Sequence, residues 1–153
     1  LLVVKEPRAT PAGFMFDSIE FHKAAGLLLE RAICVTLPIY FLFGRAIELG
    51  LKAFLLHEGV SEQQLAKHDL GHNLHALLKD AEARGLSNYV SLKTPERGMI
   101  ELLGREYQNT RLGYRVTDAI YYLPPIDHIK NITSNLISGL RCLCQESNAN
   151  SDT

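Results

Sequence analysis

The chain has no tryptophan, only three cysteines and almost no net charge over its 153 residues. A formal charge of −1 creates no general attraction for a phosphate backbone or an acidic membrane, so any anion site must be local. Cys34, Cys142 and Cys144 are odd in number, and one intervening residue is too short a spacing for an ordinary disulfide. We therefore expect a reducing compartment, the cytoplasm.

The sequence also lacks alternating strand patterns and a long uncharged apolar segment. Its most apolar stretch, residues 33–56, meets Arg45 after about 12 uncharged residues, whereas a membrane span needs roughly 20. We expect no membrane insertion and interpret 38–58 as a buried central helix, with Pro38 in its first turn and Gly59 as its C-cap. With 46% hydrophobic residues, the chain can form one domain with a core.

Helical periodicity interrupted by turn signals predicts an all-α fold, a five-helix up-and-down bundle around that central helix. The predicted helices cover about 18–35, 38–58, 70–84, 95–109 and 124–143, with a brief capped turn at 61–64. The predicted N-caps are Asp17 or Ser18, Asp69 and Thr94. The predicted parts of the chain are a flexible N-terminal arm at 1–13, the bundle domain at 14–145 and a frayed tail at 146–153.

Three motifs carry a resemblance to a known family. Residues 46–53 read AIELGLKA, the segment 68–70 reads HDL, and RLGYRVTDA follows the fourth predicted helix at 111–119. Together they resemble the HEPN domain family over roughly 18–143. The resemblance implies a helical bundle, frequent dimerisation and functions that range from metal-independent RNases to non-catalytic modules. The modules bind nucleotides, nucleic acid or a partner nucleotidyltransferase.

The catalytic members of the family share an Arg that is followed four to six residues later by His. No arginine of this chain has a histidine at that distance. The resemblance therefore implies a HEPN-like binding module without a cofactor, expected to form a homodimer and to engage a nucleotide, RNA or a partner protein such as a nucleotidyltransferase.

The best candidates for ligand contact lie around the long connection after the fourth predicted helix. Tyr107, Arg111, Tyr114 and Arg115 combine planar rings with guanidinium groups, the mixture that stacks on bases and contacts phosphates. The same side chains can equally fasten the connection to the bundle. We predict a ligand site there and keep the structural role as the alternative.

A second candidate is the charged strip of the central helix. Arg45, Glu48 and Lys52 are separated by three and four residues, so they can form an ion-paired strip. They can also lie along a groove or a dimer interface at the surface. In a functional version, Glu48 orders Arg111 or Arg115 so that the arginine binds a phosphate.

Three histidines in and just before the third predicted helix have the spacing of metal ligands. His68, His72 and His75 lie on one side of a helical wheel, but Lys79 lies among them and repels a dication. We therefore expect a solvated polar face and no metal.

Two further functions remain open. A metal-independent RNase would use Arg111 or Arg115 together with His128 as general acid or base. A purely structural subunit would use an exposed apolar helix face instead.

Overall fold

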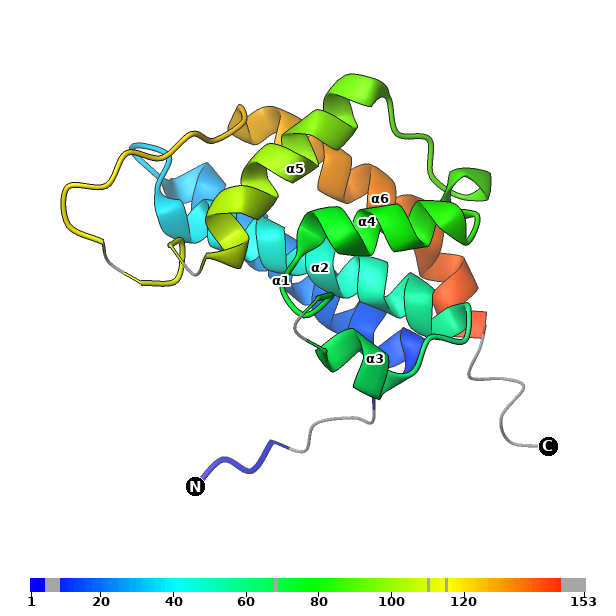
Figure 1. Ribbon diagram of the computed structural model, residues 1–153. Helices are drawn as coiled ribbons and strands as arrows, with labels where there is room; N and C mark the ends of the chain where they lie inside the picture. Colours follow the sequence, from blue (N-terminus) through cyan, green and yellow to red (C-terminus); the bar gives the residue numbers. More distant parts are fainter. Residues whose placement is uncertain (5–8, 68, 110, 115, 147–153) are drawn as a thin grey trace.

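A computed structural model describes residues 1–4, 9–67, 69–109, 111–114 and 116–146. This part of the chain is helical, without any strand, and the predicted helical bundle is confirmed (Figure 1). The helices are α1 (Pro11–Arg31), α2 (Leu37–His57), α3 (Glu62–Ala66), α4 (Leu74–Ala83), α5 (Thr94–Gln108) and α6 (Ile126–Glu146), with a 3-10 turn η1 (Leu86–Asn88). Among the described residues, none of the helices combines the length and the apolar character that a bilayer crossing requires.

The central helix is α2, as predicted. It contacts α1, α4, α5 and α6 (Figure 1). Most of its side chains are buried. Pro38 lies in its first turn, and Gly59 follows its end with φ of 90°, a left-handed conformation that favours glycine. The fully buried side chains of α2 include Phe43, Ile47 and Phe54.

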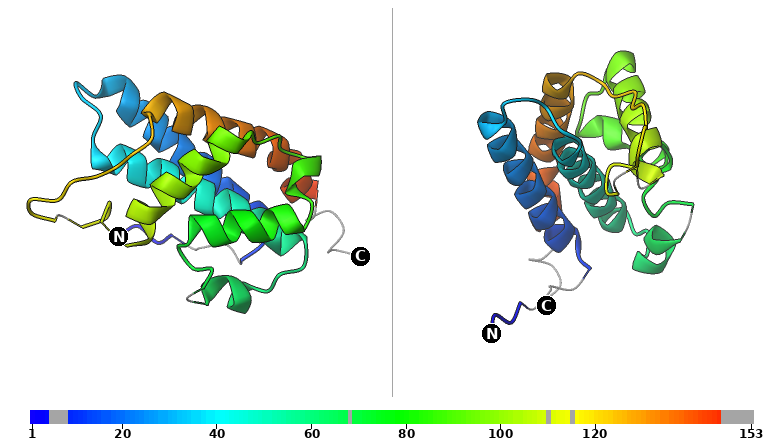
Figure 2. Two further views of the ribbon diagram at one scale, coloured as in Figure 1. Left: turned by 45° about the horizontal axis from the view of Figure 1, so that its top comes forward. Right: turned by 90° about the vertical axis from the view of Figure 1, so that its left-hand side faces the viewer.

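The predicted start of α1 was wrong by about two turns. Thr10 is the N-cap, because its Oγ1 accepts the backbone N–H of Gly13 at 3.0 Å, and Pro11 occupies the first turn. Part of the predicted flexible arm is therefore helical. Ser18, one of the two predicted caps, is buried and donates its hydroxyl to the carbonyl of Ala46 at 2.6 Å, which ties α1 to α2. The two helices form the expected antiparallel hairpin (Figure 2).

The predicted start of α4 was also wrong. Asn73, rather than Asp69, is the N-cap, and its side chain accepts the N–H of Ala76 at 3.0 Å. The residues before it form turns, in which the N–H of Leu70 donates to the carbonyl of Lys67. His72 consequently lies outside the helix. The predicted apolar stripe persists within α4 and buries Leu74, Leu77, Leu78 and Ala81.

The remaining helix starts follow their local signals closely. Ser61 and Gln64 form the predicted capping box before α3. Thr94, predicted as a cap, is the first residue of α5, and Glu96 accepts the backbone N–H of Lys93 at 2.6 Å. The helix α6 begins directly after the double proline at 124–125 and buries Ile129, Ile132, Leu136 and Leu140. The predicted tail beyond 146 lies outside the described residues.

The cysteines are free thiols, with Cys34 and Cys142 exposed and Cys144 buried. Burial raises the pKa of the Cys144 thiol to about 12. Cys142 and Cys144 therefore do not pair, as the spacing predicted.

Candidate functional site

A fully buried carboxylate on α2 is the centre of the candidate site. Its Oε1 atom accepts a hydrogen bond from Nη1 of Arg45 at 2.8 Å and another from Nζ of Lys52 at 2.7 Å. The carboxylate belongs to Glu48, which has no exposed surface. The partners lie about one turn to either side on the same helix, so these contacts match the ion-paired alternative for the strip.

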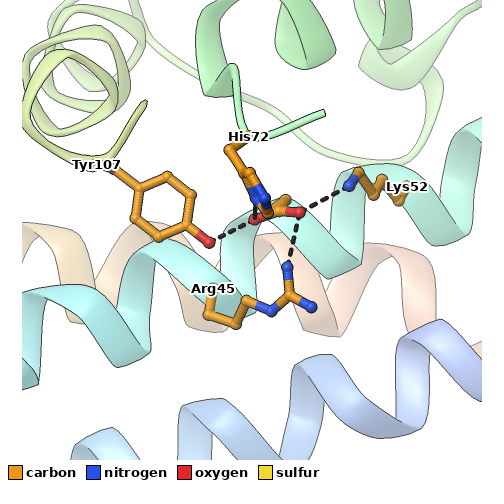
Figure 3. Close-up of polar contacts among 5 residues, drawn as sticks. Arg45, Lys52, His72 and Tyr107 are labelled. Carbon is orange, nitrogen blue, oxygen red and sulfur yellow. Dashed lines mark hydrogen bonds and ion pairs between the residues drawn. The ribbon is translucent and has the colours of Figure 1, made fainter. Parts of the chain in front are cut away.

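The other oxygen of Glu48 joins α2 to two distant segments. Oε2 accepts the hydroxyl hydrogen of Tyr107 from α5, and it lies 3.2 Å from Nδ1 of His72 in the turn before α4. Figure 3 shows Arg45, Lys52, His72 and Tyr107 converging on this point from different sides. Each oxygen therefore has two partners, which is how a buried carboxylate becomes satisfied.

Gly44 on α2 leaves room for the ring of Tyr107. A Cβ atom at Gly44 would lie 2.7 Å from Cδ2 of Tyr107, so only the absence of a side chain lets the ring lie against α2. The ring also packs near Phe41 and meets the edge of His72, with centroids 5.8 Å and 6.3 Å away. The position of the phenol next to Glu48 thus depends on close contact between α2 and α5.

Charge compensation fixes the protonation states in this cluster. Burial favours a raised pKa for Glu48, but the charges of Lys52 and Arg45 and the hydrogen bonds from Lys52 and Tyr107 hold it below its ordinary value. Burial and the neighbouring carboxylate both raise the pKa of Tyr107. For Arg45, burial lowers the pKa, yet Glu48 and Tyr107 outweigh it and raise the value. At neutral pH the site holds a carboxylate, a neutral phenol and a guanidinium.

A pocket of about 410 Å³ opens directly above this cluster. Its lining consists of Phe41, Arg45, His72, Tyr107, Gly113 and Tyr114. Arg45 keeps 31% of its side chain exposed although it is paired with Glu48, and the side chain of His72 is mostly exposed. Tyr114 stands at the rim and is 71% exposed. The pocket therefore offers cationic groups next to aromatic rings.

Two of the four predicted ligand residues line the pocket. Tyr107 and Tyr114 line the pocket, whereas Arg115 lies outside the described residues. Arg111 fastens the connection after α5: it donates to the carbonyl of Ile120 at 2.9 Å and lies over the ring of Tyr121 at 4.8 Å.

The acidic partner of Arg111 is Glu106. Nη1 of Arg111 lies 3.1 Å from Oε2 of Glu106, an ion pair that lacks hydrogen-bond geometry. The hypothesis that Glu48 orders Arg111 is therefore wrong, because Glu106 occupies that role. For Arg111, the structural alternative of fastening the connection describes the observed contacts.

His72 and His75 have different acidic partners and do not form a common site. His72 pairs with Glu48, while Nδ1 of His75 lies 3.0 Å from Glu101 on α5. His68 lies outside the described residues, and His128 is an exposed residue of the first turn of α6. Within the described ranges, no three His, Cys, Asp or Glu side chains gather in a way that holds a metal ion.

Sequence reasoning missed three residues of the pocket, which are His72, Phe41 and Gly113. His72 was expected on a solvated helix face, because the turn before α4 was predicted as helix. The available signal was Asn73, an N-cap residue type directly after His72 that precedes the apolar stripe. Phe41 had no distinguishing signal, since it is one of many apolar residues in α2.

Comparisons of the chain with family models, curated proteins and solved structures gave no significant match. The resemblance to the HEPN family therefore stays a prediction that rests on the three sequence motifs.

Proposed function

We propose that this chain is a HEPN-like binding module that holds a nucleotide, free or as a unit of RNA, in the pocket above Glu48. The observation that carries the proposal is the pocket's combination of a half-buried guanidinium with aromatic rings. A nucleotide has the complementary parts, a phosphate and a planar base.

The phosphate would be bound by Arg45 and His72. Arg45 and Lys52 are two basic side chains that pair with a single carboxylate, so the cluster has more basic than acidic groups. Glu48 fixes the Arg45 side chain before any ligand arrives, which lowers the entropic cost of binding. Because the chain as a whole is nearly neutral, this local excess is what attracts an anion.

The base would stack on the rings at the pocket's edge. Phe41 is partly buried in the wall, and Tyr114 is exposed at the rim, so both have ring surface that faces the pocket or solvent. Stacking of this kind tolerates any base. We therefore expect little discrimination among the four bases.

The proposal includes two further parts that come from the HEPN resemblance: the module acts as a homodimer, and its partner is a nucleotidyltransferase. A third part, that it works in the cytoplasm, comes from the cysteines. The free thiols of Cys34 and Cys142 suit a reducing compartment.

A metal-independent RNase is the second candidate function, and one observation favours it. Glu48 engages Nδ1 of His72, so Nε2 is the ring nitrogen that remains for proton transfer, and Arg45 lines the same pocket. These residues replace the pairing of Arg111 or Arg115 with His128 that the sequence suggested, because Arg111 and His128 do not line the pocket and Arg115 lies outside the described residues. Cleavage of RNA in the presence of a chelator, abolished by His72→Gln, tests this candidate.

The binding proposal is tested by titrating the protein with the four ribonucleoside monophosphates, the matching nucleosides and a single-stranded RNA oligonucleotide. Tyr114→Ala should weaken binding by about fivefold to 100-fold, the range for loss of one base stack. Tyr122→Ala is the matched control, since Tyr122 belongs to the same connection, is 69% exposed and does not line the pocket. Arg45→Gln should remove the preference for nucleotides over nucleosides.

Each arm of the titration has a distinct outcome. Binding of monophosphates identifies a nucleotide module, and binding of the oligonucleotide alone identifies an RNA module. If wild type binds neither, or if the two tyrosine variants lose affinity equally, the pocket is not the site. If wild type binds neither the monophosphates nor the oligonucleotide, protein pairing remains as the function.

A further inference from the structure

The outward face of α1 carries exposed large apolar side chains. The inner face of the helix packs on α2 and α6, and the helix forms an outer edge of the molecule (Figure 2). The exposed positions of α1 are Phe16, Glu20, Lys23, Ala24, Leu27, Leu28, Glu30 and Arg31. Phe16 and Leu27 are 59% and 62% exposed and lie on the same side of the helix.

Five of these residues form a single stripe along the helix. Phe16, Glu20, Ala24, Leu27 and Arg31 follow the spacing i, i+4, i+8, i+11 and i+15 that keeps side chains on one face. The stripe has an acid, Glu20, in its first half, a base, Arg31, in its second half and apolar residues between the two charges. Glu20 also pairs with Lys23, an exposed residue next to the stripe, at 2.9 Å.

The stripe is complementary to itself when a second copy runs in the opposite direction. In a two-fold pairing centred between residues 25 and 26, Glu20 faces Arg31 of the second copy, and Ala24 faces Leu27 of that copy. Symmetry repeats both contacts. The small Ala24 lets the helix axes approach closely, and Leu27 of the other copy covers it.

A parallel arrangement of the two α1 helices matches the charges less well. A parallel pairing would place the two copies of Glu20 together and the two copies of Arg31 together, which is repulsive. The exposed apolar residues near the two ends of α1 also favour the antiparallel arrangement. It brings Phe16 towards the turn that follows α1 in the other copy, where Ile33 and Val35 are exposed.

We propose that this face of α1 is a two-fold interface through which two copies of the chain pair in antiparallel orientation. The proposal specifies the homodimer that the proposed function includes. It is independent of the nucleotide pocket, because α1 contributes no side chain to the lining of that pocket. Failure of ligand binding therefore leaves the interface intact, and failure of dimerisation leaves the pocket intact.

A charge-reversal rescue tests the predicted register. Sedimentation equilibrium over a dilution series gives the dimer Kd of wild type, Glu20→Arg, Arg31→Glu and the double variant. Each single reversal creates two like-charge contacts and should raise the Kd about tenfold at low salt, and the double variant should restore it. The two positions lie about 16 Å apart within one helix, so a rescue cannot arise inside one chain.

Two further variants test whether the dimer forms through this face of α1 or through another part of the surface. Leu27→Glu should raise the dimer Kd by roughly 30-fold or more. Arg105→Glu, a charge reversal at an exposed position of α5, should leave the Kd unchanged. The substituted side chains are exposed, so circular dichroism and the melting temperature should stay at the wild-type values.

A monomeric wild type at the highest concentration overturns the proposal. A dimer that tolerates Leu27→Glu overturns it as well, since the interface then lies on another face. A double variant that stays as weak as the single ones refutes the antiparallel register.

Discussion

Replacing Glu48 by glutamine tests the buried cluster most severely, because it removes one charge and keeps the shape. Lys52 is only 12% exposed and Arg45 31% exposed, so both cations lose their counter-charge where water compensates poorly. Removing one partner of a buried ion pair costs about 3–5 kcal/mol. We expect Glu48→Gln to lower the free energy of unfolding by about 3 kcal/mol, since Arg45 can still turn towards solvent.

The assay is urea unfolding followed by circular dichroism, with thermal unfolding as a second measurement. For a chain of this size, a loss of 3 kcal/mol corresponds to a fall in Tm of about 6–12 °C. Glu101→Gln is the matched control, because Glu101 is a half-exposed carboxylate with a histidine partner, and its change should stay within about 0.5 kcal/mol. A Glu48→Gln variant as stable as this control would refute the reasoning.

The same variant carries a pH signature. The pKa of Glu48 is lowered in the folded protein, despite burial, by Lys52 and Arg45. The stability that its charge contributes is therefore fully present above the ordinary value of 4.5 and is lost as the pH falls through the lowered pKa. The difference between wild type and Glu48→Gln should shrink below pH 4.5, and a difference that widens there would contradict this assignment.

Three other changes have defined outcomes. Gly44→Ala should displace the ring of Tyr107 and cost about 1–3 kcal/mol in urea unfolding, with weaker ligand binding in the titration. Gly139→Ala should cost more than Gly44→Ala in the same assay, because its Cβ would lie 2.5 Å from the rigid carbonyl oxygen of Tyr89. Burial lowers the pKa of His22, so wild type should lose stability as the pH falls below 6.5, and His22→Gln should show a flatter pH profile of Tm.

The architecture was largely predictable because it depends on local and periodic signals. The apolar run of α2, the leucines of α4 and the prolines before α6 specify helices without knowledge of their partners. The charges around Glu48 were recognisable for the same reason, since a spacing of three and four residues brings side chains together in any helix.

The candidate site was only partly predictable because its contacts are distant in sequence. Tyr107 reaches Glu48 through the close approach of α5 at Gly44, and no local pattern encodes that approach. His72 reaches the same carboxylate because the N-cap of α4 is Asn73, so the helix starts later than it would with the predicted cap Asp69. The role predicted for Arg111 was wrong for a similar reason. Its pairing with Glu106 depends on how the connection after α5 folds back, which no local pattern encodes.

The most direct test of the nucleotide pocket is an NMR titration of the isotopically labelled protein with a ribonucleoside monophosphate. The account predicts saturable shifts of the backbone amides of Phe41, Arg45, His72 and Tyr114, which line the pocket, while Tyr122 remains unchanged. Shifts confined to other surfaces, or no shifts at any nucleotide concentration, would contradict it.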